Sequence, residues 1–158
     1  MATKKIRQAQ ESNAPSAEAV RSWLSVVRAY NLCDALLARE LASIGLRNAE
    51  YEILANLLRE PGLSQQALVE RCFVAKSHMS GLLTSMQERG WLRRDSHPQD
   101  ARAKCLYLEA DGQLMAEQGK LAQAKVVNIM AKTITPEQMA QVHAAMLPIC
   151  DALEAQLR

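Results

Sequence analysis

The chain has 158 residues, of which 49% are hydrophobic and 4% aromatic, and its formal net charge is +2. This length and composition suit one buried core in a mostly α-helical protein and argue against a disordered chain. No apolar run reaches the roughly 18 residues that span a bilayer, and the polar N-terminus lacks the apolar stretch of a signal peptide. We therefore expect a cytoplasmic protein without a membrane partner.

The N-terminal part of the chain predicts an arm followed by one long helix. Residues 1–15 are polar and include three lysines and arginines, so we expect a disordered basic arm. Ser16 can cap a helix that runs to about Ile44 and ends before Gly45. Apolar residues recur along it at helical spacing but cover more than one face, which indicates packing on two sides.

The middle of the chain predicts three helices followed by a hairpin. The first covers residues 48–59 with Asn48 as its cap, and the second is a short helix capped by Ser64. The third covers residues 76–89 and ends before Gly90. Two short helices joined by a tight turn are typical of a helix-turn-helix.

The hairpin follows directly, because the apolar pattern changes at Trp91 from helical to strand-like. Two strands are predicted over residues 91–94 and 102–108, joined by a polar link that contains Pro98. A hairpin in this position would form the wing of a winged helix.

The C-terminal part predicts two more helices. One runs over residues 110–131, and Thr135 followed by Pro136 and Gln138 gives a strong start to the other. Pro148 predicts a kink near residues 144–148. The last helix carries apolar residues in alternating steps of three and four, the spacing of a seam against another helix, at Met139, Val142, Met146, Ile149 and Leu153. We interpret this seam as a dimerisation surface, although packing within one chain would also satisfy it.

Taken in order, these elements predict a mostly α fold with a small β-hairpin wing. A winged helix-turn-helix would cover residues 46–109. The N- and C-terminal helices, residues 16–45 and 110–158, would form a helical dimerisation region.

The charge of the chain is concentrated in the predicted winged helix. Residues 71–104 hold seven cations against three anions. Concentrated positive charge suits a phosphate backbone, but it also occurs on ordinary solvated surfaces. On a helical wheel, residues 76–89 place small polar side chains opposite an apolar stripe, so this helix could enter a major groove.

We therefore predict double-stranded DNA as a partner. The candidate contacts are Ser64, Gln65, Lys76, Ser77, His78, Ser80, Gly81, Thr84, Arg94, Arg102 and Lys104. Asp100 is expected to brace the wing by holding Arg102, because a carboxylate would repel phosphate. The short polar groups of the helix offer single hydrogen bonds, so wing and phosphate contacts should supply much of the affinity and DNA shape part of the specificity.

The run from Leu63 to Gly112 resembles the MarR family of bacterial transcriptional regulators. Residues 63–68 are similar to the helix that precedes that family's recognition helix, and residues 79–92 to the recognition helix and its passage into the wing. Residues 100–102 match the D-x-R of the family's wing. Phe73, Ala75 and Gly81 depart from the usual Gly, capping Ser or Asp, and basic residue. Arg47 and Glu109 replace a capping Thr, which predicts weaker helix starts.

The resemblance implies a homodimer that reads a pseudo-palindromic operator, usually as a repressor. It also implies release from DNA by a small, often phenolic, effector or by an oxidant. An effector pocket could involve Trp23, Tyr30 and Tyr51, although core packing is the commoner fate of such side chains.

Two alternatives stay open beside ligand control. Cys33 and Cys150 lie in the expected dimerisation helices, where oxidation could alter the spacing of the DNA-binding parts. The same fold could also serve as a protein-interaction module that binds no DNA.

The sequence carries no signal for an enzyme, a metal site or a cofactor. The four cysteines form no C-x-x-C pair, and the three histidines lack the spacing of metal ligands. No Gly-rich phosphate loop, G-x-S-x-G or H-E-x-x-H motif occurs in the sequence.

Overall fold

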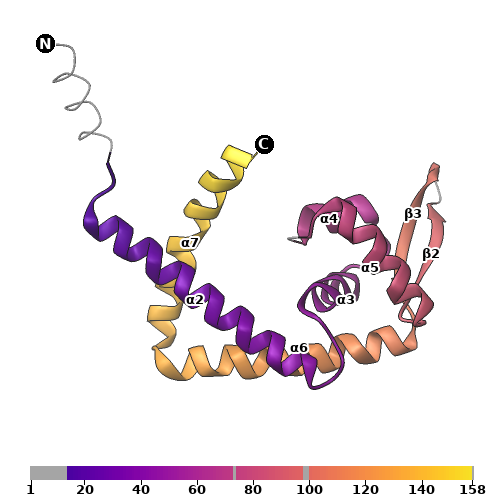
Figure 1. Ribbon diagram of the computed structural model, residues 1–158, viewed down its shortest axis with the longest axis horizontal. Helices are drawn as coiled ribbons and strands as arrows, with labels where there is room; N and C mark the ends of the chain where they lie inside the picture. Colours follow the sequence, from indigo (N-terminus) through magenta and orange to yellow (C-terminus); the bar gives the residue numbers. More distant parts are fainter. Residues whose placement is uncertain (1–13, 73, 98–99, 158) are drawn as a thin grey trace, which may run out of the picture. The chain divides into compact units, whose positions relative to one another are not determined.

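The computed structural model describes the chain except residues 1–13, 73, 98, 99 and 158, and it describes the backbone alone for Lys76, His97 and residues 100–103. Most of the predicted basic arm therefore lies outside the described residues. The elements are α2 (Ala17–Ala42), α3 (Asn48–Arg59), β1 (Leu63–Ser64), α4 (Gln65–Arg71), α5 (Lys76–Glu88), β2 (Leu92–His97), β3 (Asp100–Leu108), α6 (Ala110–Thr133) and α7 (Pro136–Leu157). Figure 1 shows these elements in chain order. The mostly helical fold with a small wing is confirmed.

The chain forms two compact units, residues 1–36 and residues 37–158, whose boundary falls inside α2. In the first unit, the hydroxyl of Ser16 accepts a hydrogen bond from the backbone N–H of Ala19 at 3.1 Å, which confirms the predicted cap. Most of the large apolar side chains of this unit are exposed: Trp23 keeps 62% of its surface accessible and Tyr30 keeps 66%.

The second unit contains the hydrophobic core. Side chains from α3, α4, α5 and the sheet meet in it, and the small residues of α6 cover one side. The largest fully buried apolar side chains are Leu41, Leu46, Ile53, Leu54, Leu57, Leu68, Met79, Leu83, Met86, Leu92 and Leu106. Complete burial of a leucine side chain contributes about 1.5–3 kcal/mol to the free energy of folding, so this core is the main source of stability of the winged helix.

The sheet has three antiparallel strands in the order β1-β3-β2. The sequence predicted β2 and β3 but not β1, whose Leu63 pairs with Leu106 of β3. Two residues are too few to show the alternation that marks a strand, which explains the omission. The hairpin is also longer than predicted: β2 starts at Leu92 rather than Trp91 and extends to His97, and β3 begins at Asp100.

The cap predicted for α7 agrees with the structure, whereas the cap predicted for α3 does not. Thr135 and Gln138 form the predicted capping box, with reciprocal side-chain to backbone hydrogen bonds of 2.9 and 3.2 Å. At α3 the prediction is wrong by one residue: the cap is Arg47, and Asn48 is the first helical residue. Here the carboxylate of Glu50 accepts the backbone N–H of Arg47 at 3.0 Å and so holds the start of the helix.

The last helix, α7, is apolar but uncovered. None of the side chains of Pro136–Leu157 is buried, and helix continues on both sides of Pro148. In the predicted seam, Val142, Ile149 and Leu153 are 48%, 47% and 60% exposed. Within the described ranges, no helix combines the length and the apolar character needed to cross a bilayer.

Candidate nucleic-acid interface

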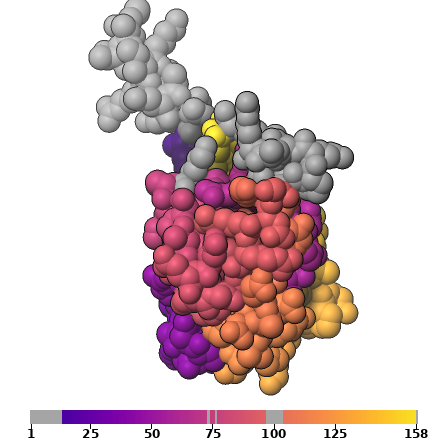
Figure 2. All heavy atoms as spheres, turned by 90° about the vertical axis from the view of Figure 1, so that its right-hand side faces the viewer, coloured from indigo at the N-terminus to yellow at the C-terminus, as the bar shows by residue number. Residues whose placement is uncertain are grey.

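The structure gives α5 the two faces that the helical wheel predicts. Met79, Leu83 and Met86 are fully buried. Their opposite face is exposed and consists of Ser77, His78, Ser80, Gly81 and Thr84. Figure 2 shows that α5 and the wing strands, in magenta to salmon, gather on one face beside the orange α6. Most side chains on this exposed face are small, so the helix could approach a DNA groove closely.

Ser64 and Gln65, at the start of α4, are half-buried. The hydroxyl of Ser64 accepts the backbone N–H of Ala67 at 3.1 Å, so its role in the free protein is to cap α4. A contact from either side chain to DNA stays a prediction.

Arg94 on β2 joins the wing to α5. Its guanidinium donates a hydrogen bond to the hydroxyl oxygen of Thr84 at 3.3 Å, and that hydroxyl donates to the backbone carbonyl of Ser80 at 3.0 Å. Arg94 is half-buried. Two residues that the sequence proposed as separate DNA contacts are thus bonded to each other, which fixes the wing against the exposed face of α5.

The outer part of the wing is described mainly through its backbone. Lys104 is exposed, and its ammonium donates to the hydroxyl of Ser96 on the opposite strand at 3.0 Å. The backbone of Asp100 pairs with that of His97. The side chains of Arg102, Asp100 and Lys76 lie outside the described part, so the predicted brace and the predicted phosphate contacts remain predictions.

Among the described side chains of residues 71–104, three cations are engaged in ion pairs within the chain. Arg71 contacts Glu60 at 2.5 Å, and Arg93 contacts Asp95 at 3.0 Å and Glu109 at 3.3 Å. These hydrogen bonds raise the pKa of both guanidiniums.

Arg89 is the third of these cations, and it pairs with Glu50. Glu50, Glu60 and Glu109 all lie outside the segment in sequence. A charge count along the chain therefore overstates the positive charge that is free for a partner.

Glu50 is a buried carboxylate at the centre of one such network. It is 1% exposed, and its Oε1 accepts hydrogen bonds from the guanidiniums of Arg47, at 2.6 Å, and of Arg89. Burial alone would raise the pKa of Glu50, but the hydrogen bonds from Arg47 and Arg89 outweigh it and hold the pKa below its ordinary value. Sequence reasoning missed this residue, because 39 positions separate it from Arg89.

Tyr51, a residue proposed for an effector pocket, packs between α3 and α6. It is 4% exposed, and its hydroxyl donates to the side-chain oxygen of Gln123 at 2.8 Å. Gly119 lets the two helices approach, since a Cβ there would lie 2.3 Å from the tyrosine ring. A groove of about 490 Å³ adjoins this contact, lined by Tyr51, Ala55, Leu58, Arg59, Ala116, Glu117, Lys120 and Gln123.

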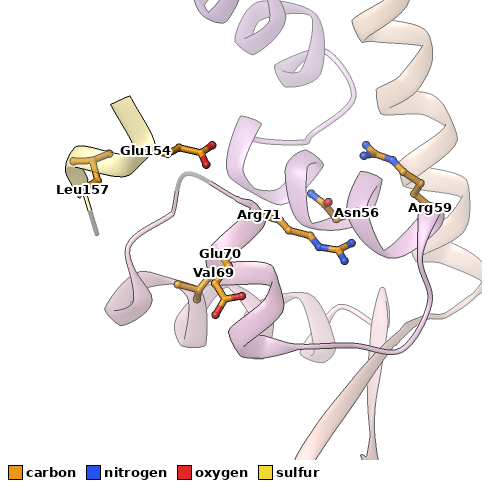
Figure 3. A pocket seen from close by; sticks show the side chains of 7 residues that line it. All are labelled: Asn56, Arg59, Val69, Glu70, Arg71, Glu154 and Leu157. Atoms are coloured by element: carbon orange, nitrogen blue, oxygen red, sulfur yellow. The ribbon is translucent and has the colours of Figure 1, made fainter. Parts of the chain in front are cut away.

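A second, larger groove of about 1060 Å³ lies along α3 and α4. Figure 3 shows its lining side chains, which are Asn56, Arg59, Val69, Glu70, Arg71, Glu154 and Leu157. Arg71 in this groove is occupied by its ion pair with Glu60. The lining is mixed in charge and gives no set of side chains that converges on one ligand chemistry.

The four cysteines differ in accessibility. Cys150 is exposed and Cys33 half-buried, whereas Cys72 and Cys105 are buried. Burial raises the pKa of the Cys72 thiol to about 11. Within the described residues, no group of three or more His, Cys, Asp or Glu side chains is placed to hold a metal ion.

Comparison with known proteins agrees with this geometry. A model of the MarR family matches residues 44–103. The transcriptional regulator HosA of Escherichia coli O111:H- is 31% identical over 68 residues, which are 43% of this chain and 50% of HosA. The chain therefore spans about half the length of this curated relative.

Two solved structures from Streptomyces coelicolor show the fold. AbsC, a MarR family transcriptional regulator, superposes with a TM-score of 0.81 at 22% identity and covers 90% of this chain and 99% of its own. Sco3205, another MarR family regulator, was solved in complex with DNA. Its TM-score is 0.79 at 24% identity, with 89% of this chain and 94% of its own covered.

Proposed function

We propose that the protein is a transcriptional regulator of the MarR family, whose model matches residues 44–103, and that it binds double-stranded DNA as a homodimer. The observation that carries the proposal is the exposed polar face of α5, fixed beside the wing by the hydrogen bond between Arg94 and Thr84. A similar fold, that of Sco3205, has been solved with DNA.

In this proposal α5 enters the major groove and the wing lies along the adjacent minor groove. Ser77, His78 and Ser80 offer single hydrogen bonds to base edges or phosphates, and Gly81, which has open space where a Cβ would stand, lets the helix backbone approach closely. Arg102 and Lys104 of the wing supply positive charge for a narrow minor groove.

The apolar side chains that the single chain leaves exposed support the proposed dimer. They recur on α7 at the spacing of a helix-packing seam, and a second copy of the chain can cover them on both protomers at once. Two linked winged helices would then contact two half-sites, and occupation of a pseudo-palindromic operator would block transcription. On this model the protein is a repressor.

The test is binding of purified protein to a pool of random-sequence duplexes, followed by sequencing of the duplexes that it retains. We expect a two-fold symmetric preferred sequence and an affinity that falls steeply with salt, because each neutralised phosphate releases a counterion. Arg102→Ala and Lys104→Ala should each reduce the salt slope by roughly one. Lys132→Ala, at the far end of α6, is the matched control and should leave the slope unchanged. Absence of salt-sensitive binding would refute the proposal.

We further propose that a small molecule releases the protein from DNA by binding the groove beside Tyr51. This groove adjoins the close contact between α3, a helix of the DNA-binding part, and α6, which leads to α7. Phenol and ring-substituted phenols are the probes. A phenol that acts here should weaken DNA binding by the wild-type protein, and Ala55→Met, which fills the groove, should reduce that effect while DNA affinity without ligand stays unchanged. Equal responses of the two proteins would place the effector elsewhere.

A further inference from the structure

The carboxylate of Glu50 holds together segments of the chain that lie far apart in sequence. Its Oε2 accepts the backbone N–H of Arg47 at 3.0 Å, which fixes the start of α3. Its Oε1 accepts the guanidiniums of Arg47 and Arg89. Only 1% of the surface of Glu50 is exposed, so water cannot readily replace these contacts, and losing one would be energetically costly.

Arg89 stands where α5 ends, so its position sets the position of that end of the helix. It is the C-cap residue, directly after Glu88. Gly90 follows with φ +71°, and the backbone N–H of Trp91 donates to the carbonyl of Met86 at 2.9 Å, which is the hydrogen bond of a Schellman motif. The Arg89 guanidinium also lies over the Trp91 ring, 3.6 Å from its centroid. A planar group held by a carboxylate and an aromatic face has little freedom to move.

The next residue after Glu50 makes the opposite connection. Tyr51 contacts α6 through its hydrogen bond to Gln123 and its close approach to Gly119. Two consecutive side chains of α3 thus reach α5 on one side and α6 on the other. The first turn of α3 is therefore the point at which the end of α5 is fixed relative to α6.

We propose that Glu50 is a positioning residue for DNA recognition, which fixes the recognition helix α5 through Arg89 without touching DNA itself. The inference rests on the proposed function. Its physical reason is that Ser77, His78 and Ser80 each offer single hydrogen bonds, whose strength falls steeply when distance and angle change. Attraction to phosphates tolerates such shifts, because it depends on charge at longer range. Loss of Glu50 should thus harm sequence discrimination more than it harms binding to DNA in general.

The experiment compares two duplexes: the sequence that the wild-type protein selects from a random pool, and a shuffled sequence of the same composition. For Glu50→Gln we expect at least a tenfold loss of affinity for the selected duplex and less than a twofold change for the shuffled one. The salt slope should stay the same, because no phosphate contact is removed. Glu60→Gln is the matched control: it breaks an exposed ion pair with Arg71, and any effect of the released charge should be equal for the two duplexes, so that discrimination is unchanged.

A second variant guards against a loss of folding. All affinities are measured where circular dichroism shows the variant to be as helical as the wild type. If Glu50→Gln does not meet this condition, Arg89→Gln removes the same link while the Arg47–Glu50 pair remains. Where both variants fold, the double variant Glu50→Gln/Arg89→Gln should discriminate about as poorly as either single variant, because both changes break one connection.

Three outcomes are decisive. If folded Glu50→Gln still discriminates between the duplexes, or loses affinity for both by the same factor, the positioning role is overturned while the proposed function stays intact. Effects of the two single variants that multiply in the double variant would show that they act independently, which also overturns it. A wild-type protein that binds neither duplex would remove the proposed function and this inference together.

Discussion

The winged helix and α7 use apolar residues in opposite ways. In residues 46–108, leucines and methionines from three helices and the sheet are completely buried within one chain. In α7, which is at least as apolar, no side chain of Pro136–Leu157 is buried. An apolar pattern of helical period shows that a face needs a cover, but it does not show whether the same chain provides it. The buried residues account for the stability of the winged helix, and the exposed residues of α7 form the surface that we propose for association.

The largest expected effect is on the winged-helix core. Leu54→Ala should lower the free energy of unfolding by about 2–5 kcal/mol, since Leu54 is fully buried and the change leaves a cavity. Urea unfolding followed by circular dichroism measures it. Leu153→Ala on α7 is the control, and in dilute protein it should cost much less. Equal losses for the two variants would erase the contrast between the regions.

The buried carboxylate of Glu50 gives the next largest effect, and it depends on pH. Its pKa is below the ordinary value of 4.5 in the folded protein, so the stability it contributes is fully present above that value and is lost as the pH falls through the lowered pKa. Glu50→Gln should thus lower the free energy of unfolding at pH 7 by about 1.5–3 kcal/mol, the usual contribution of hydrogen bonds to a charged group. The difference from wild type should be constant from pH 7 to about 5 and shrink below about 4.5. A difference that grew on acidification would contradict the assigned direction.

A charge in the seam of α7 should affect association rather than folding. Ile149→Lys places an ammonium where the proposed dimer buries an apolar side chain, and we expect the dissociation constant to rise at least tenfold, which is about 1.4 kcal/mol. Analytical ultracentrifugation over a concentration series measures this. Gln141→Lys, an exposed polar position of the same helix, tests whether charge alone has the effect. A dimer that tolerated Ile149→Lys would place the interface elsewhere.

The smallest effect is chemical and concerns the cysteines. The Cys72 thiol, with a pKa near 11, holds almost no thiolate at pH 7.5, whereas Cys150 is exposed. Iodoacetamide at that pH should modify Cys150 first and Cys72 after unfolding, as mass spectrometry of digested samples would show. Rapid modification of Cys72 in the folded protein would indicate that the winged-helix core opens readily.

The sequence predicts what depends on near neighbours along the chain. Ser16, Ser64 and Thr135 cap their helices within three residues, and the two faces of α5 follow from helical period alone. The predicted functional side chains on that face are exposed as expected. Their role in binding DNA stays a prediction.

Distant partners are what the sequence could not supply. Nothing near Arg89 indicates that Glu50 neutralises it, and nothing near Arg94 indicates that Thr84 accepts its hydrogen bond. The cap of α3 was misplaced because Glu50 does the work that a capping hydroxyl usually does, which leaves Arg47 in the cap position. Each of these contacts exists because packing brings together groups that have no local pattern in common.

The pairing of β1 with β3 also bears on the order of events during folding. It joins Leu63 to Leu106 and so closes a loop that contains α4, α5 and β2. The entropy cost of that closure is lowest once the intervening helices and the β2–β3 hairpin have already shortened the loop. We therefore expect β1 to pair after the helices and the hairpin form, so that substitutions in β1 speed unfolding more than they slow folding.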